Sequence, residues 1–341
     1  MIIKDIGKQE IPVIGNILPL KKNNIIPIKI NKKIEIVVVP NFGELNSHQD
    51  NVGIILEEKK IKKILSKRYK SVLITEINSI EDLEHLVKRK PDLVFSGVKY
   101  FFFNKKKIWL NDYLEIFAIP YIASSKAALD NESDKNRAKK IMQKENIRTA
   151  DFFITNPGEH LKESSIPIKF PLFIKPITGG DSRGIDKNSI VFNFEDFTAK
   201  VLDIKLNQNS PSLVETYLDG KEYSVGIFED SFDGSLQAMP VEIIVKKNID
   251  GHCILDFDVK KNDEEEVILV NDNKIFNKLS ELAKNSFVAL GGKSLGRIDI
   301  KMDHLGNPHF IEANLMPGLR KGYFYRSCVL NLNMSYDDMI F

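Results

Sequence analysis

This sequence is poor in cysteine and tryptophan, carries almost no net charge and contains no long apolar run. Its two cysteines, Cys253 and Cys328, lie far apart without CxxC spacing. This argues against a zinc site or a disulfide framework and favours a reducing, cytoplasmic location. Because no run reaches about 18 apolar residues, no transmembrane span is expected. The first ten residues include charges and no continuous apolar stretch, so we expect no signal peptide.

The charge balance is close to neutral. The chain has 49 Lys and Arg residues against 47 Asp and Glu residues, which gives a formal net charge of +2. A strong excess of either sign would have pointed to a nucleic acid or a membrane surface as partner. We therefore expect neither.

The first third of the chain alternates strands with helices. Buried-type strands are predicted at 34–40 (IEIVVVP), 71–77 (SVLITEI) and 91–98 (PDLVFSGV). Helices are expected within 52–69 and at 79–90, and a helix followed by a strand within 109–125. This alternation favours a parallel sheet with helical crossovers. Residues 1–32, which contain three prolines, are predicted to form an irregular extension.

The rest of the chain changes character. A small, polar stretch near 125–133 predicts a domain boundary, and Ser133 is the predicted N-cap of a helix at 133–147. Strands at 171–176 and 189–192 flank a glycine-rich loop, and a helix follows at 195–204. After residue 211 the pattern is mostly β, with a helix at 273–290 and then a hairpin. Residues 315–341 are predicted to be a basic, aromatic loop and a short terminal helix. The predicted class is α/β, becoming α+β in the C-terminal part.

The hairpin, GRIDIKMDHLGNPHFIEANLMPG (296–318), carries the most specific pattern. If Leu305 and Gly306 form its tip, Arg297 faces Asn314 and Asp299 faces Glu312. Side chains alternate along a strand, so all four lie on one face. The opposite face would be apolar and face the core, with these residues: Ile298, Ile300, Ile311 and Ala313.

Two opposed carboxylates repel each other across a sheet, so something must offset that repulsion. A divalent cation would do so, and the oxygen donors Asp299, Glu312 and Asn314 suit Mg²⁺ or Mn²⁺ better than Zn²⁺. The alternative is the solvated polar face of an ordinary amphipathic hairpin.

Three further features have similar alternatives. Lys175 ends a strand before the loop ITGGDSRG (177–184), whose backbone N–H groups could cradle phosphates, although an ordinary turn would look the same. The loop is not a Walker A motif, because no Lys-Ser/Thr pair follows Gly184. Lys135 in the first turn of a helix is either a ligand-binding cation or a surface lysine. Glu215 and Glu222 flank a turn and would suit adenine and ribose, or else face solvent.

The order and spacing of these motifs, from about 109 to 319, resemble the ATP-grasp superfamily and specifically the D-alanine–D-alanine ligase family. The segments that carry the resemblance are WLNDYLEIFAIPYIASS, SDKNRAK, PLFIKP with GGDSRG, LVETYLDGKEYSVGI, LDFDVK, and GRIDIKMD with FIEANLMPG. The resemblance implies an ATP-grasp fold. A Rossmann-like pre-ATP-grasp domain would span 1–130, a small ATP-grasp subdomain 131–212 and a large catalytic subdomain 213–341.

The resemblance also implies roles for individual residues in binding ATP. The phosphates would be contacted by Lys135, Lys175 and, at the γ-phosphate, Lys260. The loop closing over them would include Asp181, Ser182 and Gly184. The adenine pocket would be lined by Glu215, Thr216, Tyr217 and Leu218, with Glu222 on the ribose.

The reacting end would follow the same pattern. Asp299, Glu312 and Asn314 would hold two Mg²⁺ ions, with Mn²⁺ as a substitute and Glu312 bridging. Arg297 and the backbone N–H of Gly318 would stabilise an oxyanion. The implied reaction is phosphorylation of a carboxylate by ATP, followed by attack of an amine, on amino acid or small peptide substrates. Members of the family are commonly homodimers, and the sequence leaves the assembly of this chain open.

The chain departs from the family on the substrate side. SGVKYFFFNKKKIW (96–109) stands where a His-Gly…Gly-Glu-x-Gly motif is expected. Asp181 replaces the first serine of a Ser-Ser pair, and Lys261 replaces a tyrosine. The stretch LRKGYFYRS (319–327) replaces a serine-containing segment and offers Arg320, Lys321 and Arg326 as anion binders. We therefore expect a ligase with a different, larger or more acidic substrate pair.

Three alternatives stay open. The first is a simple D-alanine ligase. The second is a catalytically silent ATP-binding module that acts as a sensor or partner subunit. The third is phosphoryl transfer without amide formation.

Overall fold

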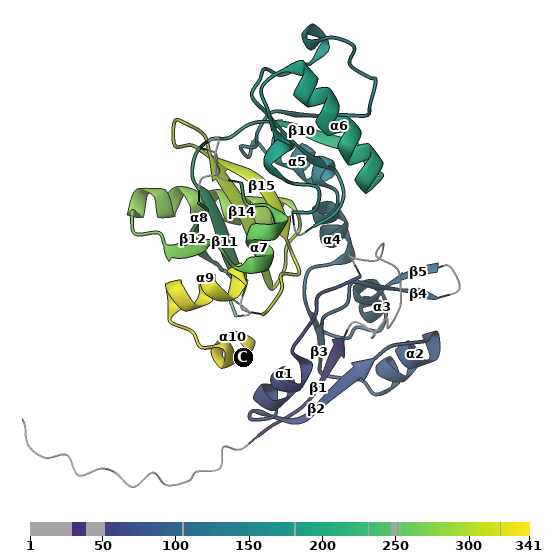
Figure 1. Ribbon diagram of the computed structural model, residues 1–341. Coiled ribbons are helices and arrows are strands. Elements are labelled where there is room, and N and C mark those ends of the chain that lie inside the picture. The colour runs from purple at the N-terminus through teal and green to yellow at the C-terminus, as the bar shows by residue number, and fades with distance from the viewer. Residues whose placement is uncertain are drawn as a thin grey trace, which may run out of the picture.

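A computed structural model of the chain describes residues 29–38, 52–103, 106–180, 182–230, 232–246, 251, 254–320 and 322–341. The predicted extension up to residue 28, together with Asp181 and Lys321, lies outside the described residues. The described chain forms an N-terminal part, a small middle part and a large C-terminal part, each built on its own sheet (Figure 1).

The N-terminal sheet is parallel, with strand order β2-β1-β3-β6. Its strands are β1 (Ile30–Val38), β2 (Tyr69–Glu76), β3 (Leu93–Ser96) and β6 (Tyr121–Ile122), and its crossover helices are α1 (Glu58–Leu65), α2 (Ile80–Lys88) and α3 (Leu110–Ile116). Ile36 and Val37 are both fully buried but belong to different core clusters, one on each face of β1. Burial on both faces explains the continuous β-branched run, and the predicted parallel sheet is confirmed.

A hairpin that the pattern did not predict follows β3. It consists of β4 (Tyr100–Phe103) and β5 (Lys106–Trp109), and it extends away from the parallel sheet (Figure 1).

Two helices, α4 (Lys126–Ser133) and α5 (Lys135–Lys144), connect the N-terminal part to the rest. The predicted N-cap at Ser133 was wrong. Ser133 ends α4, and its hydroxyl donates to the Leu129 carbonyl at 2.7 Å. Asp134 caps α5 instead by accepting the N–H of Arg137 at 3.0 Å. Lys135 is therefore the first residue of α5.

The middle part is an antiparallel sheet with strand order β7-β10-β8-β9. Its strands are β7 (Phe152–Thr155), β8 (Leu172–Pro176), β9 (Ile190–Val191) and β10 (Ser212–Thr216). The helix α6 (Phe194–Gln208) is capped by Asn193 and buries Phe197 and Val201 against Leu172 and Val214. Two short 3₁₀ turns, η1 (Glu163–Ser165) and η2 (Lys187–Ser189), complete this part. The predicted boundary between 212 and 213 runs through β10, and the domain limits stay a prediction.

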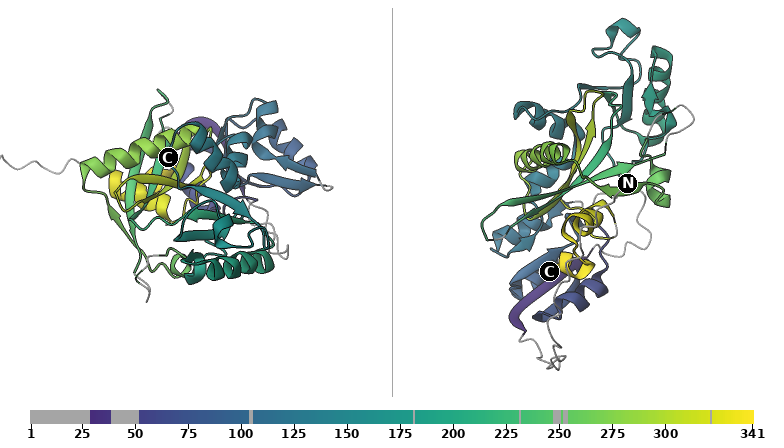
Figure 2. Two further views of the ribbon diagram at one scale, coloured as in Figure 1. Left: turned by 90° about the horizontal axis from the view of Figure 1, so that it is seen from above. Right: turned by 90° about the vertical axis from the view of Figure 1, so that its left-hand side faces the viewer.

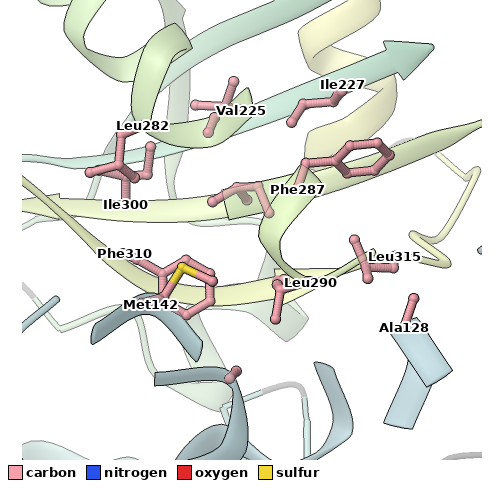
Figure 3. Packing of buried hydrophobic residues seen from close by; sticks show 14 of the residues in the cluster. Ala128, Met142, Val225, Ile227, Leu282, Phe287, Leu290, Ile300, Phe310 and Leu315 are labelled. Atoms are coloured by element: carbon pink, nitrogen blue, oxygen red, sulfur yellow. The ribbon is translucent and has the colours of Figure 1, made fainter. Parts of the chain in front are cut away.

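The large sheet has the order β13-β12-β11-β14-β15 and is antiparallel. Its strands are β11 (Glu222–Glu229), β12 (Leu236–Ile244), β13 (Glu266–Leu269), β14 (Leu295–Met302) and β15 (Pro308–Asn314). The helix α8 (Asn273–Ala289) covers one face, where Leu282 and Phe287 pack against Val225 and Ile300 (Figure 3). A short helix, α7 (Phe257–Asn262), precedes β13.

The predicted hairpin is β14–β15, and its polar register is confirmed. Arg297 pairs with Asn314 and Asp299 pairs with Glu312. A register shift follows Asp299, so that Ile300 pairs with Phe310 and not with Ile311. The predicted apolar face was therefore wrong at one position. Phe310 is fully buried in the core, whereas Ile311 is half-buried beside the cavity described below.

The C-terminal segment is more helical than predicted. It forms α9 (Tyr323–Leu332) and α10 (Tyr336–Ile340), where we expected a loop and one short helix. The helix α9 covers the second face of the large sheet, and α10 reaches the N-terminal sheet (Figure 2). Tyr336 and Ile340 share a core cluster with Ile36 and Ile61. Among the described residues, no helix is both long and apolar enough to cross a membrane.

Candidate active site

A cavity lies between the middle sheet and the large sheet. One wall comes from β8, the loop after it, and β10. The other comes from β14 and β15 on the face opposite to α8. The structure brings together here nearly all the residues predicted to bind ATP and metal: Lys135, Lys175, Ser182, Glu215, Thr216, Tyr217, Leu218, Glu222, Lys260, Asp299 and Glu312.

A buried carboxylate between two lysines lies at the floor of this cavity. Glu215 on β10 is contacted by Lys175 of β8 at 2.7 Å and by Lys139 of α5 at 2.6 Å. Burial by itself would raise the pKa of Glu215, but the two ammonium groups outweigh it and hold that pKa at about 2. Burial lowers the pKa of Lys139, although Glu215 opposes that shift. All three side chains are buried, and contact between opposite charges offsets the cost of removing them from water.

Lys139 was missed by the sequence analysis. It lies one helical turn after Lys135, on the same side of α5. A pair of lysines at i and i+4 at the start of a helix next to a predicted phosphate loop is the signal that could have found it. The ammonium group of Lys139 also donates to the Thr149 hydroxyl at 2.5 Å.

Lys135 reaches across from α5 to the glycine-rich loop, where its ammonium group donates to the Gly179 carbonyl at 2.6 Å. Burial lowers the pKa of Lys135, and Glu312 opposes that shift. An additional negative group at this position would favour the charged form of Lys135.

The loop after β8 has a positive φ at three positions, Gly179, Ser182 and Gly184. Ser182 has φ of 58° and Gly184 has φ of 74°. A Cβ at Gly184 would lie only 2.6 Å from the Pro176 side chain, so glycine is required there on two grounds. The Ser182 hydroxyl donates to the Leu255 carbonyl at 2.9 Å, which ties the loop to the segment before α7.

The end of β10 and the residues that follow it line the opposite end of the cavity. The backbone of Thr216 donates to Asp151 and that of Tyr217 donates to Pro171. Beyond the turn, Glu222 accepts a hydrogen bond from Lys301 at 3.0 Å. The predicted adenine and ribose residues therefore line the same cavity as the predicted phosphate residues.

Arg297 and Asp299 form a close pair on β14. The guanidinium donates through Nε at 3.0 Å and through an Nη nitrogen at 2.8 Å, one bond to each carboxylate oxygen. Ser224 of β11 donates to the same carboxylate at 2.7 Å. The ring of Tyr323 lies 5.4 Å from the guanidinium carbon. Burial would lower the pKa of Arg297, but Asp299 outweighs it and raises that pKa.

Glu312 lies near several cationic side chains. Burial would raise its pKa, but Lys135, Lys260, Lys175 and Arg297 together lower it. Within the described part of the chain, no hydrogen bond or ion pair to its carboxylate is seen. A carboxylate with unused oxygens, amid several positive charges, fits a metal ion that also binds phosphate oxygens.

The candidate metal site offers few carboxylate ligands. No group of three or more His, Cys, Asp or Glu among the described residues is placed to hold a metal ion. Asp299 and Glu312 provide two carboxylates, and the paired position of Asn314 adds an amide oxygen. Oxygen donors of this kind match Mg²⁺ or Mn²⁺, and the remaining ligands would have to come from water or phosphate.

Comparison with known proteins decides the family. The family model for the D-alanine–D-alanine ligase C-terminus matches residues 140–341. The chain belongs to this family. A D-alanine–D-alanine ligase of Streptococcus pyogenes serotype M49 is 26% identical over 238 residues, which make up 68% of this chain and 65% of that protein. A serotype M3 ligase matches to the same extent. The match thus spans less than two thirds of the length of these relatives.

Solved structures agree on the fold. The D-alanine–D-alanine ligase from Bacillus anthracis complexed with ATP has a TM-score of 0.64 at 18% identity, covering 91% of this chain and 94% of that one. The VanG D-Ala:D-Ser ligase from Enterococcus faecalis has a TM-score of 0.65 at 18% identity, covering 91% and 98%. The predicted ATP-grasp fold with a Rossmann-like N-terminal domain is confirmed.

The side of the cavity on which this member departs from its family is also charged. A second cavity shares Lys135, Lys260 and Glu312 with the first. Its other lining residues include Lys99, Glu132, Arg297, Asn314 and Met316. Lys99 lies in the segment that replaces the family motif, and its pair with Glu132 was not foreseen. No pattern in the sequence would have joined two residues 33 positions apart.

The stretch after the hairpin meets the predictions only in part. Arg326, a predicted anion binder, is paired with Asp263 and with Glu265 at 3.4 Å. Arg320 is exposed, and so is Gly318, which has open space beside its Cα. The predicted role of the Gly318 N–H stays a prediction.

Proposed function

We propose that this protein is an ATP-dependent carboxylate–amine ligase that joins amino acids or small peptides through an acyl phosphate, releasing ADP and phosphate. The observation that carries the proposal is a group of four cations around Glu312: Lys135, Lys175 and Lys260 line the same cavity as its carboxylate, and Arg297 lines the second cavity with it. Such an excess of positive charge suits a polyphosphate with its metal ion. Membership of the D-alanine–D-alanine ligase family supports the same reading.

The nucleotide would lie between the two sheets. Lys135, Lys175 and Lys260 would neutralise the phosphates, and the loop at Ser182 and Gly184 would close over them. The backbone and side chains from Glu215 to Leu218 would surround adenine, with Glu222 on the ribose. Lys139 would hold Glu215 in place through their ion pair.

The hairpin would serve the reacting end. Asp299, Glu312 and Asn314 would hold Mg²⁺, which supplies charge neutralisation for phosphoryl transfer when bound. Arg297, with fixed donors aimed along this face, would stabilise the oxyanion of a tetrahedral intermediate together with the Gly318 N–H. Asp299 would share its carboxylate between the metal and Arg297, so metal binding and Arg297 are linked.

The proposed chemistry has two steps. A carboxylate oxygen of the acid substrate attacks the γ-phosphorus of ATP, the bond to the β–γ bridging oxygen breaks, and ADP leaves. The amine nitrogen of the second substrate then attacks the acyl carbon. Phosphate leaves with the former carboxylate oxygen, and the nitrogen loses a proton to give a neutral amide. The protein positions and neutralises charge without offering a nucleophile of its own.

The substrates are proposed to differ from two D-alanines. Lys99, in the segment that lacks the family motif, and Glu132 of α4 line the substrate end. A charged wall suits a polar or acidic partner better than two methyl side chains.

A substrate panel tests the proposal. The protein is incubated with MgATP and pairs of D- and L-amino acids and dipeptides, and ADP release is followed together with product mass. The expected result is ADP release that depends on both substrates, with a product that has lost one water relative to their sum. ATP binding without turnover for any pair would indicate a silent sensor module instead. A phosphorylated product without condensation would indicate simple phosphoryl transfer.

A further inference from the structure

The carboxylate of Glu132 bridges two parts of the molecule. One oxygen accepts a bond from the Lys99 ammonium group at 2.5 Å, and the other accepts the backbone N–H of Leu315. Lys99 belongs to the N-terminal part, where its own backbone is fixed by bonds with Val52 and Leu110. Leu315 directly follows Asn314, the last residue of β15. A single side chain thus connects the N-terminal part to the end of the hairpin.

Both members of the pair are shielded from water. The side chain of Lys99 is 12% exposed and that of Glu132 is 5% exposed. Glu132 lies in the last turn of α4, where the helix dipole disfavours a negative charge. Lys99 and the Leu315 N–H offset that cost. A buried ion pair of this kind is weak evidence for stability and better evidence for fixing a geometry.

The carbonyl of Leu315 lies beside a second buried polar group. The hydroxyl of Ser124, which is fully buried, accepts the Lys293 backbone N–H at 3.0 Å and lies 3.3 Å from the Lys293 carbonyl and 3.4 Å from the Leu315 carbonyl. Asn111 in turn bonds the Ser124 carbonyl at 2.5 Å. The Leu315 side chain is buried near Ala128 of α4 (Figure 3). Residue 315 is therefore fixed at its N–H by Glu132 and at its side chain by packing near Ala128, and its carbonyl lies next to Ser124.

We propose that Glu132 is a positioning residue for the reacting end of the site, and that Lys99 sets its position from the N-terminal part. By holding the Leu315 N–H, Glu132 fixes where β15 ends and so where Asn314 presents its carboxamide. Glu132, Lys99, Asn314 and Arg297 line one cavity, so the link acts at the site itself. The inference rests on the proposed function for its effect on metal and substrate, but the clamp on Leu315 can be tested without it.

Hydrogen–deuterium exchange of the full chain without ligands tests the clamp. Glu132→Ala is expected to speed exchange in peptides covering 311–320, since the Leu315 N–H loses its acceptor. Glu132→Gln keeps an acceptor oxygen and is expected to change exchange less. Lys99→Met is expected to speed exchange in the same peptides, because the carboxylate loses the cation that orients it. Glu145→Ala, an exposed glutamate at the end of α5, is the matched control and should change nothing there.

Metal binding tests the consequence. Mn²⁺ affinity is measured by electron paramagnetic resonance in the presence of adenylyl imidodiphosphate. Loss of a supporting residue typically weakens metal binding about tenfold, and we expect this for Glu132→Ala, with affinity for the nucleotide alone unchanged. Unchanged exchange at 311–320 in Glu132→Ala overturns the clamp. Changed exchange with wild-type Mn²⁺ affinity overturns the positioning role.

The two proposals fail in different ways. If the wild-type chain binds no Mn²⁺ with the nucleotide analogue, the proposed function fails while the exchange result on Leu315 still stands. If the wild type binds both and Glu132→Ala behaves like Glu145→Ala in both measurements, the positioning role fails while the proposed function stands. Circular dichroism melts of each variant establish that the folded chain is being compared.

Discussion

The guanidinium of Arg297 holds both oxygens of the Asp299 carboxylate two residues further along β14, at 3.0 and 2.8 Å. The group proposed to stabilise an oxyanion and a group proposed to bind metal therefore neutralise each other. Metal binding by Asp299 would compete with these two bonds and would leave the Arg297 guanidinium freer to face the substrate. Tyr323 keeps it on the same face through a ring contact at 5.4 Å. Substitution of Arg297 should consequently affect both turnover and metal binding.

Arg297→Met is expected to lower kcat by about 100-fold, as for loss of one oxyanion donor, while KM for ATP changes little. It is also expected to bind Mn²⁺ no more weakly than the wild type, because Asp299 loses its competing partner. Arg297→Lys should recover little of kcat, since an ammonium group cannot make the two parallel bonds. Steady-state kinetics and Mn²⁺ titration check this. Lys293→Met, at an exposed lysine, is the control, and wild-type kcat in Arg297→Met would contradict the assignment.

Glu312→Gln separates metal binding from nucleotide binding. The neutral amide should weaken Mn²⁺ binding at least about tenfold, because a carboxylate oxygen is lost from a short donor set. Affinity for an ATP analogue in the presence of EDTA should instead stay the same or increase. The carboxylate that repels phosphate is gone, while Lys135, Lys175, Lys260 and Arg297 remain. Isothermal titration with and without metal measures both. Glu281→Gln, exposed on α8, is the control.

Much of this site follows from alternation and order alone. The pairing of Arg297 with Asn314 and of Asp299 with Glu312 could be predicted because a two-residue period and one turn position fix the register of a hairpin. The bulge that follows could not be predicted. It moves Ile311 to the cavity and Phe310 into the core, and it depends on packing against Met142 and Leu290, which are distant in sequence.

The contacts between distant segments were likewise beyond the sequence. Lys139 contacts Glu215 across 76 positions, although its spacing from Lys135 offered a hint. Glu132 contacts Leu315 across 183 positions with no such hint. The helix α9 was predicted as a loop because basic and aromatic residues mask its apolar face, which becomes recognisable only when Phe324 and Cys328 lie against the large sheet. Local chemistry was therefore predictable, and the buried charge network was not.

The Lys139–Glu215–Lys175 triad predicts a pH dependence of stability. The pKa of Glu215 is lowered from the ordinary value of 4.5 to about 2, so the ionised carboxylate stabilises the folded state above pH 4.5. That gain is lost as pH falls from 4.5 towards 2, because the unfolded chain takes up the proton first. Lys139→Met removes one of the two ammonium groups and should move the pKa of Glu215 back up. Its stability should therefore fall less steeply over this range.

Urea unfolding at pH 4.5 and at successively lower pH checks this for the wild type and the variant. At pH 7 Lys139→Met also loses a buried ion pair, which costs roughly 3 kcal/mol when one partner is left behind. Lys140→Met, an exposed neighbour on the same helix, serves as control and should follow the wild-type curve. Equal steepness in Lys139→Met and the wild type would contradict the assigned role of Lys139.

The last prediction concerns the loop over the phosphates. Gly184 has φ of 74°, and a Cβ there would meet Pro176 at 2.6 Å, so Gly184→Ala carries both backbone strain and a clash. Its free energy of unfolding should fall by about 1–3 kcal/mol, and its affinity for an ATP analogue should fall as the loop changes shape. Gly180→Ala, in the same loop with open space beside its Cα and without a left-handed φ, should stay within about 0.5 kcal/mol of the wild type. Urea unfolding and nucleotide titration of the two variants together separate the requirement for glycine at 184 from a general sensitivity of the loop. Equal losses in both variants would mean that loop composition, and not the conformation of Gly184, is what the site requires.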